Sequence, residues 1–230
     1  MINSRKPTNQ SALTAVFCIL SILILTDYAL SQSSQPEEAF IKDGHYIELD
    51  QVQPVQTGDK IEVLEVFWYE CPHCYRLHPV INEWLKNKPE TAEYVPMPVY
   101  FNPERNEFSA RAFYTFEVLD KLDPLHSMMF HAIHDERRSL RTKENLATWA
   151  EEFGVSGQDI INTFDSFAID SKINFSKVMT RQYGITGVPT IIIDGRYMTS
   201  VSHAGNHENL IDVMNFLIEK ARQVRLELGK

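Results

Sequence analysis

The amino-acid sequence predicts an α/β protein in which helices cover a sheet and a long helical segment separates two groups of strands. Three observations lead to this fold class. An apolar run rich in β-branched and aromatic residues at 60–69 passes directly into a helical pattern that begins at Cys71. Residues 102–183 then carry helical signals and no strand-like run. Strand signals return only at 187–198.

Residues 1–31 have the arrangement of a secretory signal peptide. Basic residues precede an apolar run at 12–25, and the small residues Ala29 and Ser31 lie before the expected cleavage point. The apolar run is shorter than the roughly 20 residues that span a bilayer. We therefore expect cleavage after Ser31, with an uncleaved anchor as the alternative. Cys18 leaves with the signal, so two cysteines remain in the mature chain.

Composition limits the classes of function. The 230-residue chain has 22 Lys and Arg residues against 31 Asp and Glu residues, a formal net charge of -9. This excess of acid makes nucleic acid and anionic membrane surfaces poor candidate partners. An exported chain of this length can bury a full core without disulfide staples, so its single close cysteine pair indicates a function rather than structural support.

The first half of the predicted sheet follows a polar linker at 32–43. Residues 44–52 alternate loosely and predict a first strand. The run at 60–69 is too continuously apolar for a half-exposed strand, so we place it in the middle of the sheet. A helix is predicted from Cys71 to about Asn87. The strand predicted at 91–101 contains two prolines, which places it near a sheet edge.

Local signals also mark the later elements. Within the helical segment, Ser156 and Asp159 form a capping pattern ahead of apolar residues. The Asp194-Gly195 pair predicts a tight turn between two strands. Apolar residues at helical spacing from Leu210 to Leu228 predict an amphipathic final helix.

The Cys71-Pro72-His73-Cys74 sequence is the strongest chemical motif. At a helix start, Cys71 faces unpaired backbone N–H groups and the positive end of the helix dipole, both of which favour a thiolate. Cys74 lies one turn further on the same face and is the expected resolving thiol. His73 can offer a hydrogen bond or positive charge to the Cys71 thiolate, and Pro72 suits the first helical turn. A permanent disulfide or a zinc site is the alternative, but zinc needs further ligands that the motif does not supply.

Glu65 is a carboxylate inside an apolar strand. An isolated charge there is costly, so we expect Glu65 to be protonated or paired, with a raised pKa. Glu70, directly before the first cysteine, is expected to oppose the Cys71 thiolate unless solvent screens it.

The strand leading into Cys71-Pro72-His73-Cys74, together with Gly187-Val188-Pro189-Thr190 far downstream, resembles the DsbA family of bacterial thiol:disulfide interchange proteins. The similarity runs from about Gly44 to the end of the chain. It implies a thioredoxin fold with an inserted all-helical domain. The implied boundaries are a signal peptide at 1–31, a linker at 32–43, a thioredoxin-like domain at 44–101 and 182–230, and an inserted helical domain at 102–181.

The resemblance also implies site roles and partners. Glu65 would lie beneath the cysteines and shuttle protons to Cys74. Val188, Pro189 and Thr190 would form a cis-proline loop that binds an extended substrate. We expect a periplasmic, monomeric dithiol–disulfide oxidase that acts on reduced, unfolded exported polypeptides. A quinone-linked membrane oxidase of the DsbB type would regenerate it, with no metal and no cofactor besides the Cys71–Cys74 disulfide.

Two other classes of function stay open from sequence. One is a disulfide reductase or isomerase, although Val188 before the proline and the single-domain length count against the isomerases of the superfamily that the chain resembles. The other is a non-enzymatic protein: a peptide-binding chaperone, or a metal carrier that uses Cys71, His73 and Cys74. The sequence does not distinguish a general oxidase from a specialised paralogue.

Overall fold

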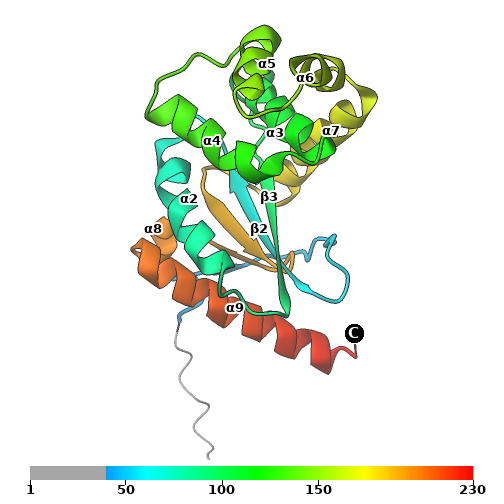
Figure 1. Cartoon of the computed structure of the whole chain (residues 1–230). Coiled ribbons are helices and arrows are strands. Elements are labelled where there is room, and N and C mark those ends of the chain that lie inside the picture. The colour runs from blue at the N-terminus through cyan, green and yellow to red at the C-terminus, as the bar shows by residue number, and fades with distance from the viewer. Residues whose placement is uncertain (1–39, 230) are drawn as a thin grey trace, which may run out of the picture. The chain divides into compact units, whose positions relative to one another are not determined.

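The computed structural model describes residues 40–229 (Figure 1). The predicted signal peptide at 1–31 and most of the predicted linker at 32–43 lie outside the described residues. Within the described part, no helix is both long enough and apolar enough to cross a membrane.

A five-stranded mixed sheet forms the centre of the described chain. Its strands are β1 (Ile47–Glu48), β2 (Ile61–Phe67), β3 (Ala92–Pro98), β4 (Thr190–Ile193) and β5 (Tyr197–Thr199), in the spatial order β1-β5-β4-β2-β3. Strands β2 and β3 pair in parallel, and the other pairs are antiparallel. The predicted interior position of β2 and edge position of β3 are therefore confirmed.

Helices occupy both sides of the sheet and one end of it. Figure 1 shows α2 and α9 beside the sheet and α3 to α7 gathered beyond one end. The helices are α2 (Pro72–Leu85), η1 (Pro103–Glu107, a π-helical turn), α3 (Phe108–Val118), α4 (Leu122–His134), α5 (Lys143–Glu151), α6 (Gly157–Phe164), α7 (Phe167–Gln182), α8 (Val201–Ala204) and α9 (His207–Glu227). The predicted helical segment between β3 and β4 is confirmed, whereas α8 was not predicted.

Strand β2 is buried on both faces, which explains its continuous apolar sequence. Ile61 and Val63 pack in one cluster with side chains of α2 and α9. Leu64 and Val66 point the other way and pack with Met179 of α7. Because successive side chains alternate between faces, the position of Glu65 places its side chain on the α2 side.

Several local predictions hold and two fail. The Ser156 hydroxyl accepts a hydrogen bond from the Asp159 N–H at 3.2 Å and caps α6. Asp194 and Gly195 both have positive φ, 56° and 62°, in the tight turn between β4 and β5. The predicted strand at 44–52 is reduced to Ile47–Glu48, because its partner β5 has only three residues. Leu228 lies past the end of α9 and is exposed, so the apolar face ends before it.

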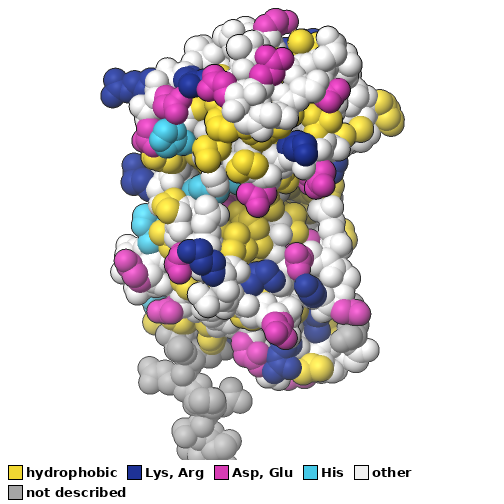
Figure 2. Space-filling view, viewed as in Figure 1, with side chains coloured by type: hydrophobic (Ala, Val, Ile, Leu, Met, Phe, Trp, Pro, Cys, Tyr) yellow, Lys and Arg dark blue, Asp and Glu magenta, His cyan; other side chains and the backbone are white. Residues whose placement is uncertain are grey.

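Charged side chains are spread over the face of the protein that Figure 2 shows. On the face shown in Figure 2, Lys and Arg side chains are interspersed with Asp and Glu side chains and do not gather into one basic patch.

Candidate active site

The two cysteines lie where β2 passes into α2. Cys71 is the N-cap residue of α2, and its N–H donates to the carbonyl of Trp68 at 3.0 Å. Pro72 occupies the start of the helix, where a missing N–H costs nothing. Cys71 is 8% exposed and Cys74 is fully buried, so only the Cys71 sulfur can contact another molecule. Both are free thiols.

The surroundings of Cys71 favour its thiolate and lower its pKa to about 5. The largest cause is a hydrogen bond from the Cys74 thiol, which outweighs the opposing effect of burial. The backbone N–H groups of Cys74 and His73 also contribute, followed by the charge of His73. The predicted lowering of the Cys71 pKa at the helix start is thus confirmed in direction, but the role of Cys74 as the main stabilising group was not predicted.

Cys74 has the opposite behaviour. Burial strongly raises the pKa of its thiol, and its hydrogen bond to Cys71 raises it further. A negative charge on Glu65 acts in the same direction. The pair therefore consists of one acidic thiol that remains slightly accessible and one fully buried thiol that holds its proton.

Glu65 is almost fully buried, with 3% exposure, below α2. Burial raises the pKa of its carboxyl to about 7, as the sequence predicted. The hydroxyl of Tyr94 on β3 donates a hydrogen bond to Glu65 Oε2, which acts against that rise. Tyr94 was not predicted, because the sequence shows there only an aromatic residue in a strand.

His73 and Pro72 are both exposed at the start of α2. The Arg76 guanidinium lies 2.8 Å from Nδ1 of His73, which can accept a hydrogen bond from it when the imidazole is neutral. The Glu70 carboxyl lies near Ser109, Arg141 and His134, and burial raises its pKa. The predicted opposition of Glu70 to the Cys71 thiolate stays a prediction.

The loop before β4 lies against the cysteines. The Val188-Pro189 peptide bond is cis, as predicted, and the Cys71 thiol contacts the Val188 carbonyl oxygen at 3.5 Å. The Thr190 hydroxyl donates to the Gly187 carbonyl at 2.8 Å and braces the loop. The structure thus brings this loop and the cysteine pair into one site.

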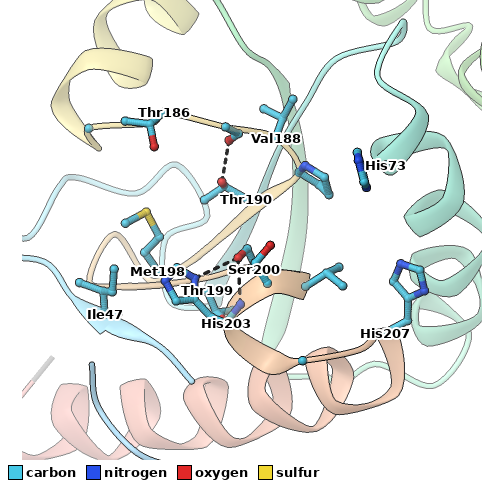
Figure 3. Close-up of a pocket in the computed structure, with 16 residues that line it drawn as sticks. Ile47, His73, Thr186, Val188, Thr190, Met198, Thr199, Ser200, His203 and His207 are labelled. Atoms are coloured by element: carbon cyan, nitrogen blue, oxygen red, sulfur yellow. Dashed lines mark hydrogen bonds between the residues drawn. The ribbon is translucent and has the colours of Figure 1, made fainter. Parts of the chain in front are cut away.

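This loop borders a groove of about 720 Å³. Figure 3 shows the segment from Thr186 to Thr190 along one part of the groove, and Ser200 and His203 from the start of α8 in another. His73 and His207 also line it. Of the described residues, those that line the groove include no Asp or Glu.

A buried polar cluster behind the site was not predicted. Nδ1 of His126 on α4 lies 2.7 Å from the Tyr69 hydroxyl, and Nε2 of His78 on α2 lies 2.8 Å from the Ser127 hydroxyl. Burial lowers the pKa of His78 to about 4 and that of His126 to about 3. Neutral His78 thus links α2 to α4, and neutral His126 links α4 to Tyr69, which follows β2.

The described residues include no group of three or more His, Cys, Asp or Glu side chains that could hold a metal ion. Two adjacent thiols of unequal acidity, at the start of a helix and against a cis-proline loop, can exchange a disulfide with a thiol of another molecule.

The fold and the paired cysteines define a disulfide oxidoreductase with a thioredoxin fold and an inserted helical domain. Comparison with known proteins agrees: residues 91–212 match the family described as DSBA-like thioredoxin domain. The chain belongs to this family.

Individual relatives extend the similarity over most of the chain. The thiol:disulfide interchange protein DsbA of Pseudomonas syringae pv. tomato is 34% identical over 204 residues, which cover 89% of this chain and 95% of that protein. DsbA of Bordetella pertussis is 34% identical over 179 residues, 77% of this chain and 85% of that protein. The crystal structure of Pseudomonas aeruginosa DsbA superposes with a TM-score of 0.76 at 34% identity, covering 80% of this chain and 96% of that one.

Proposed function

We propose that this protein donates a Cys71–Cys74 disulfide to reduced, unfolded exported polypeptides. The observation that carries the proposal is the opposite shift of the two thiol pKa values, to about 5 for Cys71 and strongly upward for Cys74. A stabilised Cys71 thiolate favours the reduced form of the enzyme, and a couple whose reduced form is stabilised is an oxidant.

The exchange follows from the exposure of the two sulfurs. A substrate thiolate attacks Sγ of Cys71, which is the accessible sulfur, and the Cys71–Cys74 bond breaks. Cys74 leaves with the electron pair and takes up a proton. A second substrate thiolate then attacks the substrate sulfur of the mixed disulfide, which releases the Cys71 thiolate and the oxidised substrate.

We assign roles to the neighbours of the cysteines on the same basis. His73 supports the Cys71 thiolate through its backbone N–H and its charge, and Pro72 starts the helix that supplies the other N–H groups. Glu65, with a pKa of about 7 and electrostatic contact with Cys74, gives a proton to the Cys74 sulfur and later takes it back.

The substrate would lie in the groove beside Val188, Pro189 and Thr190. A chain extended along this loop can pair with backbone groups, and backbone pairing does not depend on sequence. The groove thus suits clients of varied sequence, with the Val188 carbonyl beside the attacked sulfur.

The cellular setting and domain limits complete the proposal. The expected signal at 1–31 would send a monomer to the periplasm, where a quinone-linked membrane oxidase of the DsbB type would reoxidise the cysteine pair. No metal or cofactor other than the disulfide is required. The thioredoxin-like domain would comprise 44–101 and 182–230, with the helical domain at 102–181 inserted between the two parts.

Trapping of the mixed disulfide tests the proposal. Cys74→Ala should accumulate disulfide-linked complexes with reduced unfolded polypeptides. The variant lacks the Cys74 thiol, which would otherwise attack the mixed disulfide on Cys71 and release the polypeptide. Cys71→Ala serves as the matched control and should trap far less, since Cys74 is buried. Equal trapping by the two variants, or none by Cys74→Ala, would refute Cys71 as the attacked sulfur.

A further inference from the structure

Glu65 accepts a hydrogen bond from the hydroxyl of Tyr94, which lies on the neighbouring strand β3. The residues directly opposite Glu65 are Pro96 on β3 and Ile191 on β4, and neither side chain can donate. Tyr94 lies two positions before Pro96 and therefore on the same face of β3, from which its hydroxyl reaches Glu65 Oε2.

The packing fixes this contact. The Tyr94 ring meets the Trp84 ring of α2 edge-on at 6.5 Å, and the Trp84 indole is itself held by Asn215 of α9 at 3.0 Å. Burial and the nearby carboxyl raise the pKa of Tyr94 well above its ordinary value. Tyr94 therefore keeps its proton and serves only as a donor.

We propose that Tyr94 is a positioning residue that holds the Glu65 carboxyl and favours its ionised form, and so sets the pH range in which Cys74 can lose its proton. This inference rests on the proposed role of Glu65. It adds a residue that acts through Glu65 and does not touch the sulfurs.

The proton transfer from Cys74 to Glu65 takes place when the Cys71–Cys74 disulfide forms. When reduced enzyme reacts with oxidised glutathione, the Cys71 thiolate first forms a mixed disulfide and releases one glutathione thiolate. Cys74 must then transfer its proton to the Glu65 carboxylate and attack Sγ of Cys71. The bond between Cys71 and glutathione breaks, the Cys71–Cys74 bond forms, and the second glutathione leaves as the thiolate.

Among the described residues, Cys74 and Tyr94 are the titratable groups that the structure couples to Glu65. Cys74 on α2 acts on it electrostatically and Tyr94 on β3 donates a hydrogen bond to it, while Tyr69 acts electrostatically on Tyr94. A hydrogen bond from a neutral hydroxyl stabilises a carboxylate relative to the carboxylic acid. Removing it should raise the pKa of Glu65 from about 7. A rise of one unit would lower the ionised fraction at neutral pH about five-fold.

The test is the pH dependence of ring closure in Tyr94→Phe, measured by stopped flow with oxidised glutathione. The midpoint should move to higher pH, and closure at neutral pH should slow several-fold. The pKa of Cys71, read from thiolate absorbance, should change little. Tyr100→Phe is the matched control, since Tyr100 also donates to a glutamate, Glu107 at 2.9 Å. An unchanged midpoint in Tyr94→Phe would overturn the inference.

Two further measurements exclude a structural effect. In a Glu65→Gln background, Tyr94→Phe should have no additional effect on the pH profile, and a persisting shift would contradict action through Glu65. In the wild-type protein, the NMR signal of isotope-labelled Tyr94 should titrate with the same midpoint as formation of the Cys71–Cys74 disulfide. This measurement does not depend on the folding of a variant. A wild-type enzyme that forms no Cys71–Cys74 bond at all would instead refute the proposed function.

Discussion

The Sγ atom of Cys71 lies 3.5 Å from the carbonyl oxygen of Val188, although the two residues belong to separate strand groups of the fold. The contact depends on β2 and β4 being neighbours in the sheet, because β2 leads into Cys71 and the Val188 loop leads into β4. A peptide bound along the loop would therefore present its cysteine directly to the accessible sulfur.

His73→Ala should raise the pKa of Cys71 above about 5 and leave it below the ordinary value of 9.0. The variant loses the histidine charge but keeps the Cys74 thiol and the backbone N–H groups, which are larger causes. Thiolate absorbance against pH measures the change. His203→Ala, in the same groove but not among the causes of the Cys71 shift, should give the wild-type curve. A Cys71 pKa unchanged in His73→Ala would show that the side chain has no part in thiolate stabilisation.

Glu65→Gln should stabilise the reduced protein at alkaline pH and much less at pH 5. The pKa of Glu65 rises from 4.5 to about 7 on folding, so the carboxyl destabilises the folded state as pH increases through this range. The full effect above pH 7 is about 3 kcal/mol. Urea unfolding of wild type and variant at pH 5 and pH 8 checks it. An equal difference at both values would contradict a buried carboxyl that titrates near neutrality.

The buried histidines should make the protein sensitive to acid. His78 has a pKa of about 4 in the folded state against 6.5 as a free side chain, so its contribution to stability is complete above pH 6.5 and is lost as pH falls toward 4. Between these two pH values, the free energy of unfolding should fall by up to about 1.4 kcal/mol per pH unit because of this group. Denaturant unfolding between pH 7 and pH 4 should show this slope reduced in His78→Gln. His131→Gln, at an exposed position, should retain the wild-type slope.

Arg225 of α9 is expected to stabilise the turn between β4 and β5. It donates from Nε to Asp194 at 3.0 Å and from Nη1 to the Gly58 carbonyl at 2.8 Å, and Asp194 is 6% exposed. Arg225→Met should lower the free energy of unfolding by roughly 3 kcal/mol, the low end for a buried pair because Arg225 is partly exposed, since a nearly buried carboxylate loses its partner. Arg222→Met, in an exposed pair with Glu219, should change it by about 0.5 kcal/mol or less. Equal losses in the two variants would contradict a special role for Arg225.

The sequence predicted those parts of the fold that local patterns specify. The apolar run of β2, the capping Ser156 and the Asp194-Gly195 turn each carry a local physical signal, and each occurs in the structure. The extent of β1 was wrong because strand length depends on the partner strand. Residue spacing along one segment does not contain that information.

The candidate site divides in the same way. Cys71, Cys74 and Glu65 stand out because a thiol pair at a helix start and an acid in an apolar strand are unusual. The contacts of Tyr94 and of the cluster of His78 and His126 form only where strands and helices distant in sequence meet, so they could not be predicted from the sequence. The orientation of Glu70 toward the helical domain likewise depends on side chains from α3 and the segment after α4.

The most direct test of the central claim is the redox equilibrium of the Cys71–Cys74 pair in glutathione buffers, with the Cys71 pKa read from thiolate absorbance on the same sample. The proposed function predicts an oxidising couple, in which the reduced protein predominates at glutathione ratios that keep ordinary protein disulfides intact, together with a Cys71 pKa of about 5. A strongly reducing couple with an ordinary thiol pKa would contradict disulfide donation and assign the protein to the reductases or isomerases.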